Sequence, residues 1–146
     1  MQFPSRSANE GFARAAVACF AAQLDPTLDE LGDIKTAVSE AVTNCIVHAY
    51  PDSLGEIRVR ARIFPEGCLE LVVSDKGCGI ADVEQARRPM FTTGGTERAG
   101  MGFCIMESFM DTLRVRSRPD RGTTVTMSRR LRARLSAGAA PGGPAD

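Results

Sequence analysis

The chain has 146 residues, of which 43% are hydrophobic and 25% are charged, and its 18 basic and 18 acidic residues cancel to a net charge of zero. These values are typical of one soluble globular domain. The balanced charge argues against direct binding of nucleic acid or of a membrane surface, and no apolar run is long enough to span a bilayer. Because the N-terminus shows no hydrophobic leader, the expected location is the cytoplasm.

Two helices are predicted first. Residues 9–24 have apolar side chains at helical spacing, and the sequence "DPT" then ends this helix. A second helix opens near Thr27 or Asp29 and continues to about His48, before Pro51. The apolar stripe predicted for the first helix contains Phe12, Ala16, Cys19 and Phe20, and that of the second contains Leu31, Ile34, Val38, Ala41, Val42 and Cys45.

Four strands follow, at residues 56–64, 68–75, 113–118 and 122–130. Arginine occupies every second position of 58–62 and 114–118, so one face of the sheet is expected to be solvated. With a short strand at the N-terminus, the pattern predicts an α+β fold: a two-layer sandwich whose mixed, mostly antiparallel sheet is covered by helices on one face. The domain is expected to span 1–135, with a disordered tail at 136–146 that is rich in Gly, Ala and Pro.

The five cysteines stand at positions 19, 45, 68, 78 and 104, without a CxxC pair, and the chain has one histidine. This pattern argues against a disulfide framework and against a zinc site. Four of the five lie among apolar neighbours and are interpreted as small core residues.

The second helix carries a line of polar residues. Glu40, Asn44 and His48 recur at intervals of four residues and therefore share one face. A carboxylate, an amide and an imidazole in one line can serve a metal ion and a proton transfer. A solvated helix face is the alternative interpretation.

Residues 74–80, "SDKGCGI", follow a buried strand. A fixed Asp75 carboxylate can accept hydrogen bonds from an exocyclic amine, and Gly77 and Gly79 allow a flat ligand to approach the backbone. A tight turn that starts with Asp is the alternative.

The segment 75–111 between the two strand pairs is unusually long, which is typical of a functional loop. A helix is predicted from about Gly102 to Met110, so Gly100 and Gly102 would present free amides to an anion, with Arg98 beside them. Further on, "GTTVT" opens a strand with Thr123 and Thr124, whose hydroxyls could contact a ligand.

In this order, the motifs E-x3-N-x3-H, D-x-G-x-G, G-x-G and G-T-T resemble the GHKL ATP-binding superfamily, which has the Bergerat fold. Residues 12–50, "ARRPMFTT", "RAGMGFCIMESFMD" and "GTTV" are similar to the sporulation anti-sigma factor F family of serine kinases over about residues 3–130.

The resemblance implies a homodimer that binds ATP or ADP with Mg²⁺, inhibits a sporulation RNA-polymerase sigma factor and phosphorylates a serine of an anti-anti-sigma protein. It implies Glu40 as the catalytic base, Asn44 as the Mg²⁺ ligand and Asp75 as the acceptor for the adenine amine. Gly77 and Gly79 would shape that wall, and Thr123 would support the adenine. The remaining implied roles are a lid from about 88 to 99, phosphate contacts at Arg98, Gly100 and Gly102, and a partner contact at Arg14.

Two other functions stay open. One is an ATP-gated anti-sigma binding module with weak or no kinase activity. The other is a GHKL ATPase domain of the histidine-kinase type acting on another substrate, although the chain lacks a phospho-acceptor helix.

Overall fold

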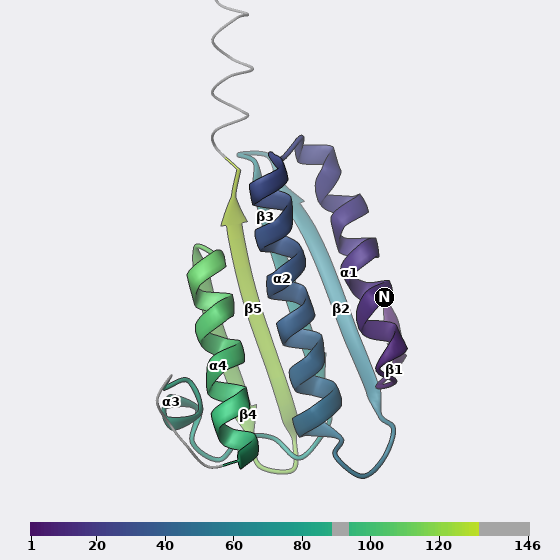
Figure 1. The fold of residues 1–146 in the computed structure, drawn as a ribbon, viewed down its shortest axis with the longest axis vertical. Coiled ribbons are helices and arrows are strands. Elements are labelled where there is room, and N and C mark those ends of the chain that lie inside the picture. Colours follow the sequence, from purple (N-terminus) through teal and green to yellow (C-terminus); the bar gives the residue numbers. More distant parts are fainter. Residues whose placement is uncertain (89–93, 132–146) are drawn as a thin grey trace, which may run out of the picture.

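The computed structural model describes residues 1–88 and 94–131, with the backbone alone for 94–100. Five strands form one sheet in the order β1-β2-β3-β5-β4, and all four neighbouring pairs are antiparallel. Helices α1, α2 and α4 lie side by side across one face of this sheet (Figure 1). The elements are β1 Gln2–Pro4, α1 Ala8–Ala21, α2 Leu28–Asn44, the π-helical turn η2 Cys45–Ala49, β2 Glu56–Phe64, β3 Cys68–Asp75, α3 Val83–Ala86, α4 Gly94–Phe109, β4 Thr112–Arg118 and β5 Gly122–Arg130.

The predicted two-layer α+β fold is therefore confirmed, and three of the four predicted strands have the predicted bounds. The arginines of β2 and β4 are exposed on the face away from the helices, as the alternating pattern predicts. The predicted tail at 136–146 lies outside the described residues. Within the part of the chain that is described, no helix combines the length and apolarity needed to cross a membrane.

Helix α2 is the central helix of the layer. Its start is fixed by a capping box, in which the Thr27 hydroxyl accepts from the Glu30 amide and the Glu30 carboxylate accepts from the Thr27 amide. Near the same end, Arg129 of β5 donates to Asp33 at 3.0 Å, which ties the helix to the sheet. These contacts, together with the buried stripe from Ile34 to Val42, set the orientation of the polar residues further along α2.

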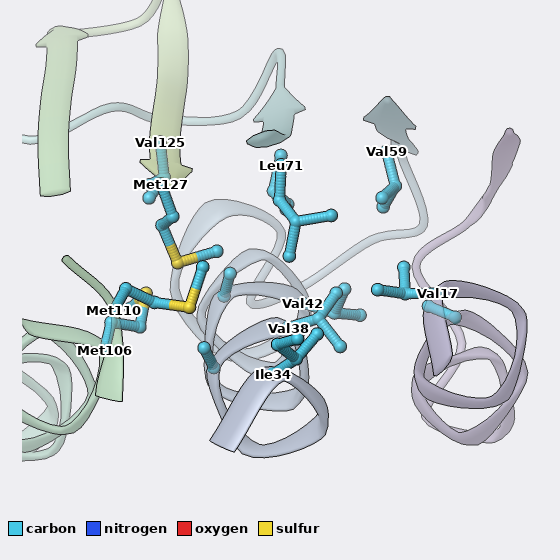
Figure 2. Close-up of a cluster of buried hydrophobic side chains, with 14 of the residues drawn as sticks. Val17, Ile34, Val38, Val42, Val59, Leu71, Met106, Met110, Val125 and Met127 are labelled. Atoms are coloured by element: carbon cyan, nitrogen blue, oxygen red, sulfur yellow. The ribbon is translucent and has the colours of Figure 1, made fainter. Parts of the chain in front are cut away.

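The core lies between the helices and the sheet (Figure 2). Val38 and Val42 of α2 meet the apolar face of β3. Met106 of α4, and Met110 just after the end of α4, meet Met127 of β5. Burial of these side chains supplies the hydrophobic free energy that holds α4 and α2 over the same sheet.

The buried face of α1 is shifted by one residue from the apolar stripe that the sequence predicts. Ala13, Val17 and Ala21 are the buried residues, whereas Phe12 is 54% exposed and packs edge-on against Phe3. Small side chains on the buried face allow α1 to approach α2 closely, so burial follows size here and not hydrophobicity alone.

The prediction that four of the cysteines are core residues is also largely wrong. All five cysteines are free thiols, but only Cys45 is buried; Cys68 and Cys104 are half-buried, and Cys19 and Cys78 are exposed.

Helix α4 begins at Gly94, about eight residues earlier than predicted. Gly100 and Gly102 therefore lie inside the helix, where a backbone amide is directed at the carbonyl four residues earlier and not at a ligand. The predicted anion site at a helix start formed by these two glycines is not present in this arrangement. The short helix α3 is missing from the prediction, although Asp82 is a helix-start signal whose carboxylate accepts from the Gln85 amide.

Candidate functional site

A cavity opens where α2 ends, between the end of β3, the start of β5 and helix α4. It is lined by Ala41, Asn44, Cys45, His48, Ala49, Asp75, Ile80, Phe103, Thr123 and Val125. Three of the predicted site residues, Asn44, Asp75 and Thr123, thus meet at this cavity. His48, from the same polar line as Asn44, lies there with them. The sheet and α2 bring them together from segments that are up to 79 residues apart, from Asn44 to Thr123.

Asp75 is the most firmly held polar residue of the cavity. Its Oδ1 atom accepts hydrogen bonds from the backbone amides of Gly77 at 2.9 Å and Thr123 at 3.2 Å. Its Oδ2 atom accepts from the thiol of Cys45 at 3.4 Å. Burial raises the pKa of the Asp75 carboxyl, and the three hydrogen bonds partly offset this increase. The carboxylate is thus oriented by its neighbours and only partly hydrated.

Cys45 is a site residue that sequence analysis interpreted only as core. Its pKa is raised well above its ordinary value, first by burial and then by the negative charge of Asp75. The thiol therefore stays protonated and is the hydrogen-bond donor of the pair. Its position directly after Asn44 is the only signal that could have suggested a role at the site.

The two glycines of the "DKGCGI" segment are required by close backbone packing. A Cβ atom on Gly77 would lie 2.3 Å from the Ala49 carbonyl oxygen, and one on Gly79 would lie 1.9 Å from that of Arg118. Gly79 also has a φ of +73°, which favours glycine. The glycines thus hold the loop against η2 and against the β4–β5 turn, a reason that sequence analysis did not give.

Cys78 and Tyr50 also hold the loop after β3 in place. The Cys78 thiol donates to the His48 carbonyl at 3.0 Å, and its amide donates to the Ala49 carbonyl at 3.1 Å. The Tyr50 hydroxyl accepts from the Lys76 amide at 2.7 Å and donates to the Glu56 carbonyl at 2.8 Å. No sequence pattern indicates the role of Tyr50, because its partners come from two different segments.

Glu40 and Asn44 lie together under α4. A Cβ atom on Gly102 would lie 3.1 Å from Asn44 Nδ2 and 3.3 Å from Glu40 Oε2, so α4 passes directly over both side chains. Asn44 Nδ2 is buried and has no hydrogen-bond partner among the described residues. A buried amide of this kind costs free energy unless a ligand satisfies it.

The cavity itself has a volume of only about 40 Å³. Ligand pockets for drug-sized molecules are roughly 300–1,000 Å³. In this arrangement α4 passes over Asn44, and the space beside that side chain is narrow.

Several predicted residues do not line the cavity, among them Glu40, which lies beside Asn44 under α4. Arg14 lies on α1, where it donates to Glu10 at 2.8 Å and to Ser39 at 3.3 Å, and it does not line the cavity. Only the backbone of Arg98 is described, in the first turns of α4. The part of the predicted lid at residues 89–93 lies outside the described residues.

Comparison with known proteins identifies the family. Residues 3–129 match the family described as histidine kinase-like ATPase domain. The chain is 56% identical over 130 residues to the anti-sigma F factor of Caldanaerobacter subterraneus subsp. tengcongensis, covering 88% of this chain and 90% of the relative. It is also 56% identical over 135 residues to the anti-sigma F factor of Pasteuria penetrans, covering 91% and 90%. The chain belongs to the anti-sigma F factor family.

The solved structures agree on the fold of this anti-sigma F factor family member. The blue-light activated histidine kinase of Erythrobacter litoralis is similar with a TM-score of 0.59 and 24% identity, over 77% of this chain and 34% of that chain. Its histidine kinase domain gives the same TM-score at 22% identity, over 84% and 65%. The cavity at the end of β3 thus lies in an ATP-binding domain, which agrees with the GHKL resemblance of the motifs.

Proposed function

We propose that the chain is an ATP-dependent protein serine kinase and an anti-sigma factor, which inhibits a sporulation sigma factor and phosphorylates a serine of an anti-anti-sigma protein. The observation that carries the proposal is the Asp75 carboxylate, fixed by two backbone amides at a cavity that also contains Asn44. A fixed carboxylate facing a cavity is suited to accept the exocyclic amine of adenine.

The other end of the site supports a transfer reaction. Glu40 lies one helical turn before Asn44, and both side chains meet α4 at Gly102. Glu40 is then the base that takes the proton of the incoming serine hydroxyl. Glu40 would serve the serine hydroxyl that accepts the γ-phosphoryl group. Its side chain is half-buried, so part of its surface stays open to that hydroxyl.

The residues present fit a magnesium ion that arrives with the nucleotide. Asn44 has an amide without a protein partner, and its oxygen is a ligand type that Mg²⁺ accepts. No group of three or more His, Cys, Asp or Glu residues suited to a metal is found in the described ranges, so phosphate oxygens would supply most ligands. When bound, Mg²⁺ neutralises charge on the phosphates; Asn44 would hold it.

The decisive experiment measures transfer of γ-phosphate from Mg-ATP to the cognate anti-anti-sigma protein. The parent chain is expected to label a serine of that protein. The Glu40→Gln variant should lose at least about 100-fold of this rate, the range for a general base, because the amide cannot take the proton. ATP binding should be kept and should not weaken, because the change removes a negative charge near the proposed phosphate position and leaves the Asp75 contact intact.

Glu66→Gln is the matched control, because it makes the same chemical change at an exposed turn residue between β2 and β3, at the opposite end of β3 from Asp75. A parent chain that binds ATP and the sigma factor but transfers no phosphate would overturn the kinase proposal and favour a binding module. Label on a histidine instead of a serine would favour the histidine-kinase alternative.

We further propose a cytoplasmic homodimer whose α1 surface contacts a partner through Arg14. Arg14 is held by Glu10 and Ser39, so its guanidinium is oriented before binding. Pull-down of the sigma factor and of the anti-anti-sigma protein by the Arg14→Ala variant tests which partner uses it. Unchanged binding of both partners would contradict the assignment.

A further inference from the structure

The two oxygens of Asp75 have different partners. Oδ1 accepts from two backbone amides, which belong to the loop after β3 and to the start of β5. Oδ2 accepts from one side chain, the thiol of Cys45, at 3.4 Å. Because Oδ1 already accepts two hydrogen bonds, Oδ2 is the oxygen that can accept a further hydrogen bond from a ligand.

We infer that Cys45 is a positioning residue for base recognition, which holds Asp75 Oδ2 in the orientation that accepts the exocyclic amine of an adenine nucleotide. This inference rests on the proposed function, because it assumes that Asp75 contacts the base. It assigns the cysteine a role beyond that of a small core residue.

Geometry supports this assignment. Cys45 is 5% exposed and lines the same cavity as Asp75, so its thiol reaches Oδ2 from the wall of η2 and not from solvent. A thiol is a weak donor, so it restrains the carboxylate without using all of its acceptor capacity.

Among the described residues, the Cys45 thiol is the side chain seen to donate to Asp75 Oδ2. Of the other titratable groups nearby, His48 lines the cavity and the Tyr50 hydroxyl is engaged by Lys76 and Glu56. The backbone amide of Lys76 donates to the Tyr50 hydroxyl and not to Asp75. Cys45 is therefore the side chain on which the orientation of Oδ2 depends.

A simple packing role for Cys45 makes a different prediction. Loss of packing would weaken every nucleotide to the same degree, because all of them fill the same cavity. Loss of positioning would weaken only nucleotides that donate an amine proton to Asp75. The two roles are separated by comparing ATP with purine riboside 5′-triphosphate, which lacks the 6-amino group.

The experiment measures the affinities of both triphosphates by calorimetry for the parent chain and for Cys45→Ala and Cys45→Ser. The parent chain should prefer ATP. In Cys45→Ala this preference should fall about three- to ten-fold, the range for one lost hydrogen bond. Cys45→Ser keeps a donor at the same position and should restore most of the preference.

Val125→Ala is the matched packing control, because Val125 lines the cavity with the same 5% exposure but no polar group. It should weaken both triphosphates equally. Thermal unfolding of each variant shows whether the fold is kept, and a Cys45→Ala variant that does not fold leaves Cys45→Ser and Cys45→Val to report the same ratio.

Two results would have different meanings. If the parent chain prefers ATP and Asp75→Asn abolishes the preference, but Cys45→Ala leaves it unchanged, the positioning role of Cys45 is wrong and the proposed site stands. If the parent chain itself does not distinguish the two triphosphates, the contact between Asp75 and the base is absent. The role of Cys45 and the assignment of Asp75 to the base then both fail, whereas the kinase activity is still decided by the phosphate-transfer assay.

Discussion

The two ends of the cavity are built in different ways. At the Asp75 end, the carboxylate is held by two backbone amides, and Gly77 and Gly79 lock the following loop against η2 and the β4–β5 turn. The other end is formed by Asn44 with Glu40 beside it, and is called the Glu40 end here. These two polar side chains lie under α4, and the buried amide nitrogen of Asn44 has no partner among the described residues.

The Asp75 end is therefore already formed, whereas the geometry of the Glu40 end depends on the position of α4. Backbone hydrogen bonds between the ends of β3 and β5 do not need a ligand to keep their geometry. At the Glu40 end, the amide nitrogen of Asn44 gains a hydrogen bond only if α4 moves or a ligand reaches Asn44. A nucleotide would therefore find the base subsite ready and would have to compete with α4 for the phosphate subsite, because the cavity has only about 40 Å³ of space.

The largest effect is expected for Gly122→Ala, which acts on the formed end. Gly122 has a φ of +96°, and a Cβ atom would lie 2.1 Å from the Asp75 carbonyl oxygen. Because that neighbour is backbone, relief requires β3 and β5 to separate, and the loss should be at least about 3 kcal/mol of unfolding free energy. Urea denaturation measures this loss.

Gly32→Ala is the matched control for that change. Gly32 lies inside α2 with no atom within 4 Å of its Cβ position. Alanine there should stabilise the chain by about 0.8–1.0 kcal/mol, because glycine is the poorer helix former. Equal effects of the two substitutions would mean that the end of β3 is not packed as described.

Much of this formed end could be predicted from the sequence. Alternation of residues 56–64 and 68–75 locates β2 and β3, and the acidic residue followed by spaced glycines locates the loop. The reason for the glycines could not be predicted, since their neighbours Ala49 and Arg118 come from distant segments. The same holds for the Cys45–Asp75 contact, which spans 30 positions.

A smaller effect is expected for Gly102→Val at the other end. The Cβ atom would lie 3.1–3.3 Å from side-chain atoms of Asn44 and Glu40, which can shift by a few tenths of an ångström. We expect a loss of about 1–2 kcal/mol from overpacking. Gly102→Ala should be close to neutral, because better helix propensity offsets the tight contact. A valine variant as stable as the parent would show that α4 does not rest on these side chains.

The position of α4 is where sequence analysis failed. The pair Gly100 and Gly102 was interpreted as the start of a helix, because glycine is a weak helix former. In the structure the helix runs through both residues from Gly94, and Phe103 and Met106 anchor it in the core. Tertiary packing thus overrides local propensity, and the close approach over Glu40 and Asn44 is what selects glycine at position 102.

The smallest expected effect is the pH dependence of stability due to Asp75. Burial raises the pKa of this carboxyl above its ordinary value of 3.8, while hydrogen bonds from Gly77, Cys45 and Thr123 act against the increase. The folded state thus binds the proton more tightly than the unfolded state. Its contribution to stability is fully present below about pH 3.9 and is lost as the pH rises through the higher folded-state pKa.

The difference in unfolding free energy between the parent chain and Asp75→Asn should therefore fall as the pH rises from about 3.9 through that window. Saturating ATP should weaken this slope, because an amine that donates to Asp75 favours the ionised form. Urea denaturation with and without ATP measures both slopes. A slope that ATP leaves unchanged would place the base away from Asp75, and the formed end of the cavity would then have no ligand contact through its carboxylate.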